Sequence, residues 1–174
     1  MKWQPLRCGG LTISNNGYVT EQVIATTIHG RYLVVAAATA GAAPLLVGFH
    51  GYGEDAEVQM ERLLAIPGSE GWIRVSIQGL HRFYGRKSER VVASWMTRQD
   101  RELAMADNLA YVGRCLDAVA AEFVTLPRVV FAGFSQGVAM AFRAAVNERR
   151  RVAGVVAVGG DIPPELTTDE LKRL

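Results

Sequence analysis

The sequence is poor in cysteine, in net charge and in long apolar runs, and each shortage excludes a class of protein. Two cysteines among 174 residues, Cys8 and Cys115, do not make a disulfide framework. The formal net charge of +2 is too small to indicate nucleic acid or an anionic membrane as a partner. An apolar run at 33–49 is short for a membrane span and is broken by Gly41 and Pro44. With no apolar signal segment at the N-terminus, we expect a cytoplasmic protein without stable membrane insertion.

Histidine is also scarce, and its placement limits the chemistry of the chain. The three histidines, His29, His50 and His81, are scattered and all precede residue 135. Such spacing does not fit a metal site, so we expect no bound metal. A nucleophile in the second half of the chain would need its base from one of these three or from elsewhere.

The pattern that the sequence does have is that of an α/β protein. No repeat, low-complexity tract or linker divides it, so we expect residues 1–174 to form one domain. Residues 18–28 and 31–38 flank His29-Gly30 and are rich in Val, Ile, Thr and Tyr, which predicts an N-terminal antiparallel hairpin. Strands and helices are then predicted to alternate over 45–49, 56–65, 72–77, 105–123, 128–132, 136–147, 152–158 and 163–174. This order predicts a mostly parallel sheet with helices on both faces.

The stretch 78–100 has no clear period and is interpreted as a long irregular segment that ends at Asp100, a candidate N-cap for the following helix. It interleaves arginines with Phe83, Tyr84 and Trp95. Long loops in compact domains are often functional. This one either walls a substrate pocket that favours an anionic group or is a solvated surface loop.

The pentapeptide Gly133-Phe134-Ser135-Gln136-Gly137 lies between an apolar strand and an apolar helix. A serine in such a strand–turn–helix context occupies a tight turn, and the glycines on either side leave room for the neighbouring strand and helix. This context indicates a nucleophile elbow, with Ser135 as the catalytic nucleophile. The turn also aims the backbone N–H of Gln136 at the reacting carbonyl.

A second motif, His50-Gly51-Tyr52-Gly53, follows the strand at 45–49 and has the H-G-x-G form of an oxyanion loop. Acyl transfer develops negative charge on the substrate's carbonyl oxygen, and preorganised backbone N–H groups stabilise it. We therefore predict an oxyanion and substrate-binding site at Gly51, Tyr52 and Gln136, with the N–H groups of Tyr52 and Gln136 as donors. A glycine-rich turn that caps the next helix is compatible with the same residues. His50 is expected to shape this turn through hydrogen bonds rather than to act as a base.

Four segments together resemble the phospholipase/carboxylesterase branch of the α/β-hydrolases, the group of bacterial carboxylesterases and acyl-protein thioesterases. They are PLLVGFHGYGEDAE at 44–57, ASWMTRQDRELAMADNLAYV at 93–112, RVVFAGFSQGVAMAF at 128–142 and VVAVGGDIPPEL at 155–166. The resemblance implies an α/β-hydrolase fold and hydrolysis of small carboxylic esters or thioesters, without metal or organic cofactor. It also implies that Ser135 is the nucleophile and that Tyr52 and Gln136 bind the oxyanion.

The chain departs from this family after the strand at 152–158. The family pattern places the triad acid after the next strand and the histidine later still, whereas no histidine follows Ser135 here. Asp161 follows a different strand and is interpreted as a loop residue. We expect the acid and histidine beyond Leu174, and a sheet that lacks its last strands and exposes an apolar edge.

Three explanations stay open from the sequence: a piece of a longer enzyme, completion by a partner chain such as a homodimer, or a natural truncation. The function alternative is a non-catalytic ligand-binding or interaction protein on the same scaffold.

Overall fold

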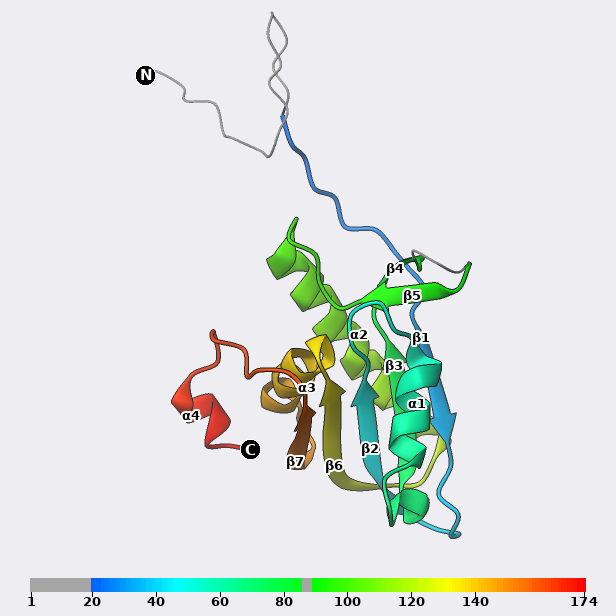
Figure 1. The fold of residues 1–174 in the computed structure, drawn as a ribbon. Coiled ribbons are helices and arrows are strands. Elements are labelled where there is room, and N and C mark those ends of the chain that lie inside the picture. Colours follow the sequence, from blue (N-terminus) through cyan, green and yellow to red (C-terminus); the bar gives the residue numbers. More distant parts are fainter. Residues whose placement is uncertain (1–19, 86–88) are drawn as a thin grey trace, which may run out of the picture.

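The computed structural model describes residues 20–85 and 89–174, and a five-stranded sheet organises them (Figure 1). The strand order is β1-β3-β2-β6-β7. The strands are β1 Arg31–Val35, β2 Ala43–Phe49, β3 Ile73–Gln78, β6 Thr125–Phe134 and β7 Arg151–Val158. Only β1 runs antiparallel to its neighbour, while β3, β2, β6 and β7 are parallel. The predicted mostly parallel α/β sheet is therefore confirmed.

Helices cover the two faces of the sheet unequally. The helix α1 Ala56–Leu64 packs against one face through the apolar cluster Leu46, Met60, Leu63 and Ala132. The other face carries α2 Arg101–Glu122 and α3 Gln136–Asn147. Their buried side chains meet alternate residues of β2, β3 and β6, because successive strand residues point to opposite faces.

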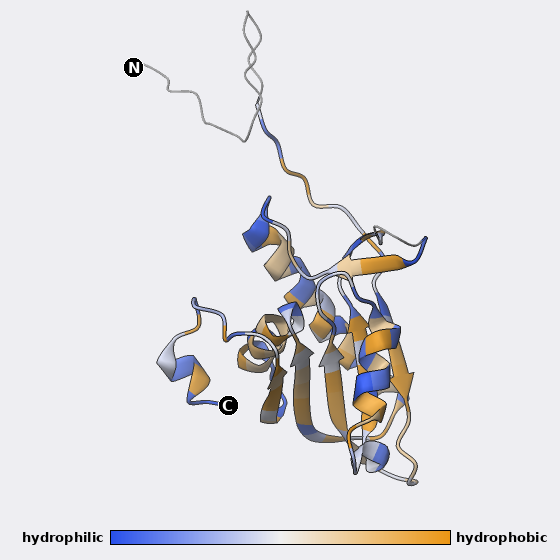
Figure 2. Cartoon of the chain, in the orientation of Figure 1, coloured by the Kyte–Doolittle hydropathy of each residue, from blue (hydrophilic) through white to orange (hydrophobic). Residues whose placement is uncertain are grey.

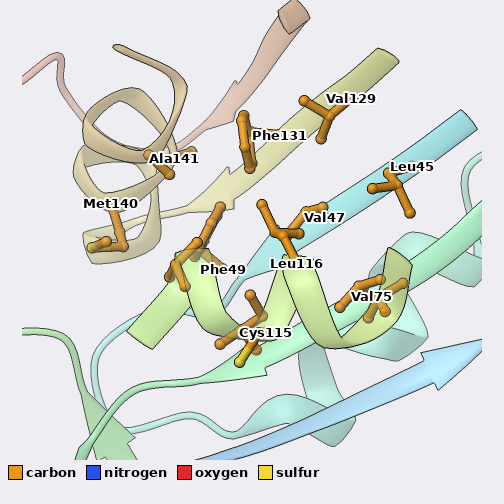
Figure 3. Close-up of a cluster of buried hydrophobic side chains, with 14 of the residues drawn as sticks. Leu45, Val47, Phe49, Val75, Cys115, Leu116, Val129, Phe131, Met140 and Ala141 are labelled. Carbon is orange, nitrogen blue, oxygen red and sulfur yellow. The ribbon is translucent and has the colours of Figure 1, made fainter. Parts of the chain in front are cut away.

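The core between the strands and the helices α2 and α3 is the larger of the two apolar clusters (Figure 3). Leu45, Val47 and Phe49 of β2 point into it, as does Phe131 of β6. Cys115 of α2 lies in the same core, as expected of a small buried hydrophobe. A strand buried on both faces needs a continuous apolar run, which explains why β2 was recognisable in the sequence.

The predicted N-terminal hairpin is wrong. Residues 20–30 form no strand, are exposed and lead away from the sheet, and residues 18–19 lie outside the described residues (Figure 1). The second predicted strand does form, as β1, but it pairs with β3. Local β-propensity predicts that a strand forms, but it does not predict which strand it pairs with. Here β1 pairs with the distant strand β3 and not with the segment directly before it. The Tyr111 hydroxyl, which donates to the Arg31 carbonyl at 2.7 Å, helps to hold β1 there.

The stretch 78–100 is more ordered than predicted. It contains β4 His81–Tyr84 and β5 Val91–Ser94, which pair antiparallel as a separate two-stranded sheet. Figure 1 shows this hairpin beyond the edge to which β2, β3 and β6 point. An antiparallel bridge between Glu54 and Ala93 fixes it beside the loop after β2. Residues 86–88, between β4 and β5, lie outside the described residues.

Two predicted helix ends also differ. Asp100 is the N-cap residue of α2, as predicted, but α2 begins at Arg101 rather than near residue 105, and the Asp100 side chain, at φ +50°, makes no capping bond. The last helix is α4 Thr168–Leu171, which begins after a capping box between Thr167 and Glu170 rather than at Pro163. A reciprocal capping box satisfies two N–H groups at the start of the helix at once. A short 3₁₀ helix, η1 Ser69–Gly71, lies between α1 and β3.

The strand β7 is an edge with apolar side chains exposed, as the sequence predicted. It pairs with β6 only. Val156 and Val158 share the face of Ala132 and Phe134, the α1 face, and are 44% and 52% exposed. Figure 2 shows apolar residues along β7 where no helix lies in front of it. Among the described helices, none is both long and apolar enough to cross a membrane.

Candidate active site

Ser135 occupies a sharp turn between β6 and α3. Its φ of +51° is one of two positive values among the described non-glycine residues, and its ψ is −119°. A non-glycine residue in so sparsely populated a conformation costs on the order of 1–3 kcal/mol and persists only where its surroundings enforce it. Its backbone N–H donates to the carbonyl of Val158 at 2.9 Å, which ties the turn to the end of β7.

Three glycines enforce this turn because no side chain fits at their positions. A Cβ on Gly133 would lie 2.4 Å from the carbonyl oxygen of Gly137. One on Gly137 would lie 2.1 Å from the Phe49 carbonyl oxygen, and one on Gly160 would lie 2.3 Å from that of Ser135. The elbow is thus packed backbone against backbone, as the G-x-S-x-G pattern predicts. Gly160, in the loop after β7, is a contributor that the pentapeptide alone did not indicate.

The His50–Glu54 loop leaves the same edge of the sheet as the elbow, because β2 and β6 are parallel and Phe49 is in register with Gly133. His50 is fully buried at its start. Its Nδ1–H donates to the Gly51 carbonyl at 2.7 Å, and its Nε2 accepts the N–H of Gly79 at 3.0 Å. A carbonyl only accepts and an N–H only donates, so these partners define the neutral tautomer. Burial lowers the pKa of His50, which favours the same neutral form.

His50 is therefore a structural residue, as predicted, with no nitrogen free to act as a base. A further layer supports it. Trp95 donates its indole Nε1–H to the His50 carbonyl at 2.8 Å, and the two rings lie 5.0 Å apart. Asn108 of α2 donates to the carbonyls of Trp95 and Ala104 at 3.0 and 2.8 Å. Its Oδ1 accepts the N–H of Leu80 at 3.2 Å.

Asn108 is a residue that the sequence reading missed. It is fully buried, although the helical pattern was drawn through apolar residues one position away. The available signal was an asparagine in line with Ala104, Tyr111 and Cys115, at the three- and four-residue spacing of one helix face. A buried asparagine must satisfy its donors and acceptor, so it marks a site where loops are tied to a helix.

The side chain of Gln136 links the start of α3 to the end of β5. The side-chain Oε1 accepts the N–H of Trp95 at 3.0 Å, and Nε2 donates to the Ser94 hydroxyl at 3.1 Å. These bonds connect the elbow to β5 and to Trp95, whose indole supports the His50 carbonyl. The sequence assigned this residue only a backbone role.

The predicted oxyanion residues differ in what their N–H groups do. The N–H of Gly51 donates to the carboxylate Oε2 of Glu54 at 2.8 Å. The N–H groups of Tyr52 and Gln136 have no partner among the described residues. The Tyr52 side chain is 65% exposed, and its ring lies 5.4 Å from that of Phe83 in β4. The Gly51 N–H is thus engaged within its own loop, whereas those of Tyr52 and Gln136 are not engaged by any described residue.

No described side chain is hydrogen-bonded to the Ser135 hydroxyl, so the structure does not pair it with a base. His29 is exposed. His81, in β4, has a buried Nε2 without a hydrogen-bond partner among the described residues. Asp161, in the loop after β7, is exposed. Among residues 20–85 and 89–174, no group of His, Cys, Asp and Glu is arranged to hold a metal ion.

A hollow of about 480 Å³ lies beside β4 and β5 and the start of α1. Its lining is Arg31, Asp55, Glu57, Gln78, Arg82, Arg90 and Val91. Arg31 pairs with Glu57 and Arg90 pairs with Asp55, so most of the charge in the hollow is internally matched. None of the lining residues belongs to the elbow or to the H-G-Y-G motif.

The fold and the two loops at one edge of its sheet define an α/β-hydrolase. The family model of phospholipases and carboxylesterases matches residues 31–173, and the chain belongs to this family. Among curated proteins, no sequence matches the chain.

Solved structures of similar fold include enzymes from plants and bacteria. Acyl-protein thioesterase 2 of Zea mays has a TM-score of 0.56 at 18% identity, over 83% of this chain and 71% of its own. The Bacillus cereus carboxylesterase has a TM-score of 0.57 at 17% identity, over 80% of this chain and 64% of its own. A phospholipase/carboxylesterase of Dyadobacter fermentans has a TM-score of 0.55 at 20% identity, over 82% and 66%. The chain thus spans about two thirds of the length of these three structures, and at these identities the likeness concerns the fold.

Proposed function

We propose that the protein is a serine hydrolase that cleaves small carboxylic esters or thioesters through an acyl-enzyme on Ser135. The observation that carries the proposal is the strained serine at the start of α3, at the same edge of the sheet as the loop that contains Tyr52. The N–H groups of Tyr52 and Gln136 have no partner among the described residues. Strain of this kind persists at functional sites because the surroundings enforce it. Membership of the phospholipase/carboxylesterase family supports the reaction class.

In the proposed mechanism, Ser135 Oγ attacks the acyl carbonyl carbon while a general base removes its proton. The carbonyl oxygen becomes an oxyanion that accepts hydrogen bonds from the N–H groups of Tyr52 and Gln136. Collapse of the tetrahedral intermediate breaks the bond to the alcohol or thiol, which leaves with a proton from the protonated base. Water then attacks the acyl-enzyme by the same steps and releases the carboxylic acid and free Ser135. The base is the part of this scheme that the described residues do not supply.

Labelling with a fluorophosphonate tests the proposal. We expect stoichiometric labelling of the chain, lost in Ser135→Ala and retained in Ser69→Ala, a serine of η1 that hydrogen-bonds the Leu63 carbonyl far from the elbow. Hydrolysis of p-nitrophenyl esters and of a thioester then distinguishes the leaving groups. Absence of labelling in the wild-type chain and in a form extended beyond Leu174 would favour the alternative, a non-catalytic binding protein on the same scaffold.

A further inference from the structure

An ion pair between Glu54 and Arg62 lies between the two loops of the candidate site. Arg62, in the last turn of α1, donates through Nη2 and Nη1 to Glu54 Oε1 and Oε2 at 2.6 and 2.8 Å. The same Oε2 accepts the N–H of Gly51. Glu54 therefore joins the backbone of the H-G-Y-G motif to a fixed helix, and the fork-to-fork geometry sets the orientation of its carboxylate.

The other side of Arg62 contacts the elbow. Its guanidinium carbon lies 4.0 Å from the ring centroid of Phe134, the residue directly before Ser135. A cation over an aromatic face is attracted by the ring quadrupole. Phe134 also packs close to the loop, because a Cβ built on Gly51 would lie 3.1 Å from Phe134 Cδ1. Contacts thus run without a gap from the Gly51 peptide through Glu54 and Arg62 to Phe134.

We infer that Glu54 and Arg62 are positioning residues of the hydrolase site, which hold the Gly51 peptide so that the next N–H, that of Tyr52, faces the acyl oxygen. The inference rests on the proposed function. By engaging the Gly51 N–H, the carboxylate fixes the His50–Gly51 peptide plane, directly before the plane that carries the Tyr52 N–H. The contact of Arg62 with Phe134 fixes the same loop relative to the serine. Neither residue touches substrate in this scheme.

Charge gives the pair a second effect on the same reaction. A carboxylate beside the oxyanion hole would repel the negative charge that develops on the substrate, and this repulsion is strong where water is partly excluded. Arg62 cancels that charge. Its hydrogen bonds lower the pKa of Glu54, so the carboxylate stays ionised and paired throughout the neutral range.

The two effects predict an unequal pattern among variants. Arg62→Met leaves an unpaired carboxylate at the oxyanion hole and should lower the rate of Ser135 phosphonylation by about 30-fold, below the cost of deleting an oxyanion donor outright. Glu54→Gln keeps an acceptor for the Gly51 N–H and should lower the rate by only about threefold. The double variant should be faster than Arg62→Met alone, because it removes the unpaired charge. Arg62→Lys, which keeps the charge, should recover most of the loss.

The loss should appear in the maximal labelling rate rather than in the apparent affinity for the probe, a split that general destabilisation of the fold does not produce. A matched control exists in the same helix: Glu57 forms two hydrogen bonds with Arg31 of β1, away from both loops. Glu57→Gln should leave the labelling rate unchanged, with melting temperatures recorded for every variant.

The outcomes separate the two proposals. If the wild type is labelled but Arg62→Met and the double variant react equally fast, or no slower than Glu57→Gln, the positioning role is overturned while the nucleophile stands. If Ser135 is not labelled in the wild type or in the extended form, the proposed function fails and takes this inference with it.

Discussion

The two loops at the candidate site are shaped by opposite means. The elbow around Ser135 is formed by exclusion: glycines bring backbone so close to backbone that no Cβ fits at Gly133 or Gly137. The loop after β2 is formed by hydrogen bonds, from the side chains of His50 and Glu54 to its own backbone. The first loop has no room for an added side-chain atom, and the second depends on hydrogen bonds. Substitutions that add volume should therefore disrupt the first loop, and substitutions that remove hydrogen bonds should disrupt the second.

The largest effect is expected when one methyl group is added to the elbow. In Gly137→Ala the new Cβ would lie 2.1 Å from the carbonyl oxygen of Phe49, and backbone rather than a flexible side chain would have to move. We expect a loss of about 3 kcal/mol or more in the free energy of unfolding, at the severe end of single substitutions, and no Ser135 labelling. Urea unfolding followed by circular dichroism measures the first.

The control for that experiment is Gly113→Ala in α2. Apart from its chain neighbours and the backbone of its own helix, no described atom lies within 4 Å of a Cβ built there. Replacing an interior helical glycine should stabilise the protein by about 0.5–1 kcal/mol, with labelling retained. Equal behaviour of the two variants would contradict the account of the elbow as a volume-limited turn.

The second-largest loss of stability is expected when a buried polar residue that supports the other loop is replaced by an apolar one. Asn108→Leu has a similar volume but leaves the Leu80 N–H and the Trp95 carbonyl without their partner. Each unsatisfied buried group costs about 1–3 kcal/mol, so we expect a loss of about 2–4 kcal/mol in unfolding free energy.

The matching control is Asn147→Leu, at the exposed end of α3, where the amide donates to the Arg143 carbonyl and to no other described residue. Its effect should stay within about 0.5 kcal/mol, as for most surface substitutions. If Asn108→Leu lowers the unfolding free energy by no more than this, the hydrogen bonds of Asn108 and Trp95 do not support the loop that begins at His50.

The contrast between the loops also explains which parts of the structure were predictable. The elbow, β2 and α3 follow from local patterns, because G-x-S-x-G and a continuous apolar run each fix a conformation within a few residues. Local patterns misled where partners are distant. Residues 20–28 have β-propensity but no partner strand, and β1 pairs with β3 instead, about forty positions away.

The site shows the same division. Ser135 and the H-G-Y-G motif were recognisable because each belongs to a motif of contiguous residues. Asn108, Trp95 and the Glu54–Arg62 pair act across segments that meet only in the folded chain. Their partners are set by the packing of α1 and α2 on the sheet, which the sequence does not state residue by residue.

The smallest expected effect is the pH dependence of the unfolding free energy. It concerns only the loop after β2, because His50 can be protonated there. Because the pKa of His50 is lowered in the folded state, the unfolded chain binds more protons as pH falls below about 6.5. Protonation of Nε2 would also break its bond to the Gly79 N–H. Stability contributed by neutral His50 is therefore fully present above pH 6.5 and is lost as the pH falls toward the folded pKa, with a slope of at most about 1.4 kcal/mol per pH unit.

Urea titrations between pH 7 and pH 5 measure this slope. His50→Gln should be less stable at pH 7 and should lack its part of the pH dependence, whereas His29→Gln, at an exposed position, should keep the wild-type profile. The elbow has no titratable side chain between Gly133 and Gly137 to add to the slope. An unchanged pH profile in His50→Gln would show that the folded protein does not hold this histidine neutral. It would then contradict the role of the His50 hydrogen bonds in shaping the loop.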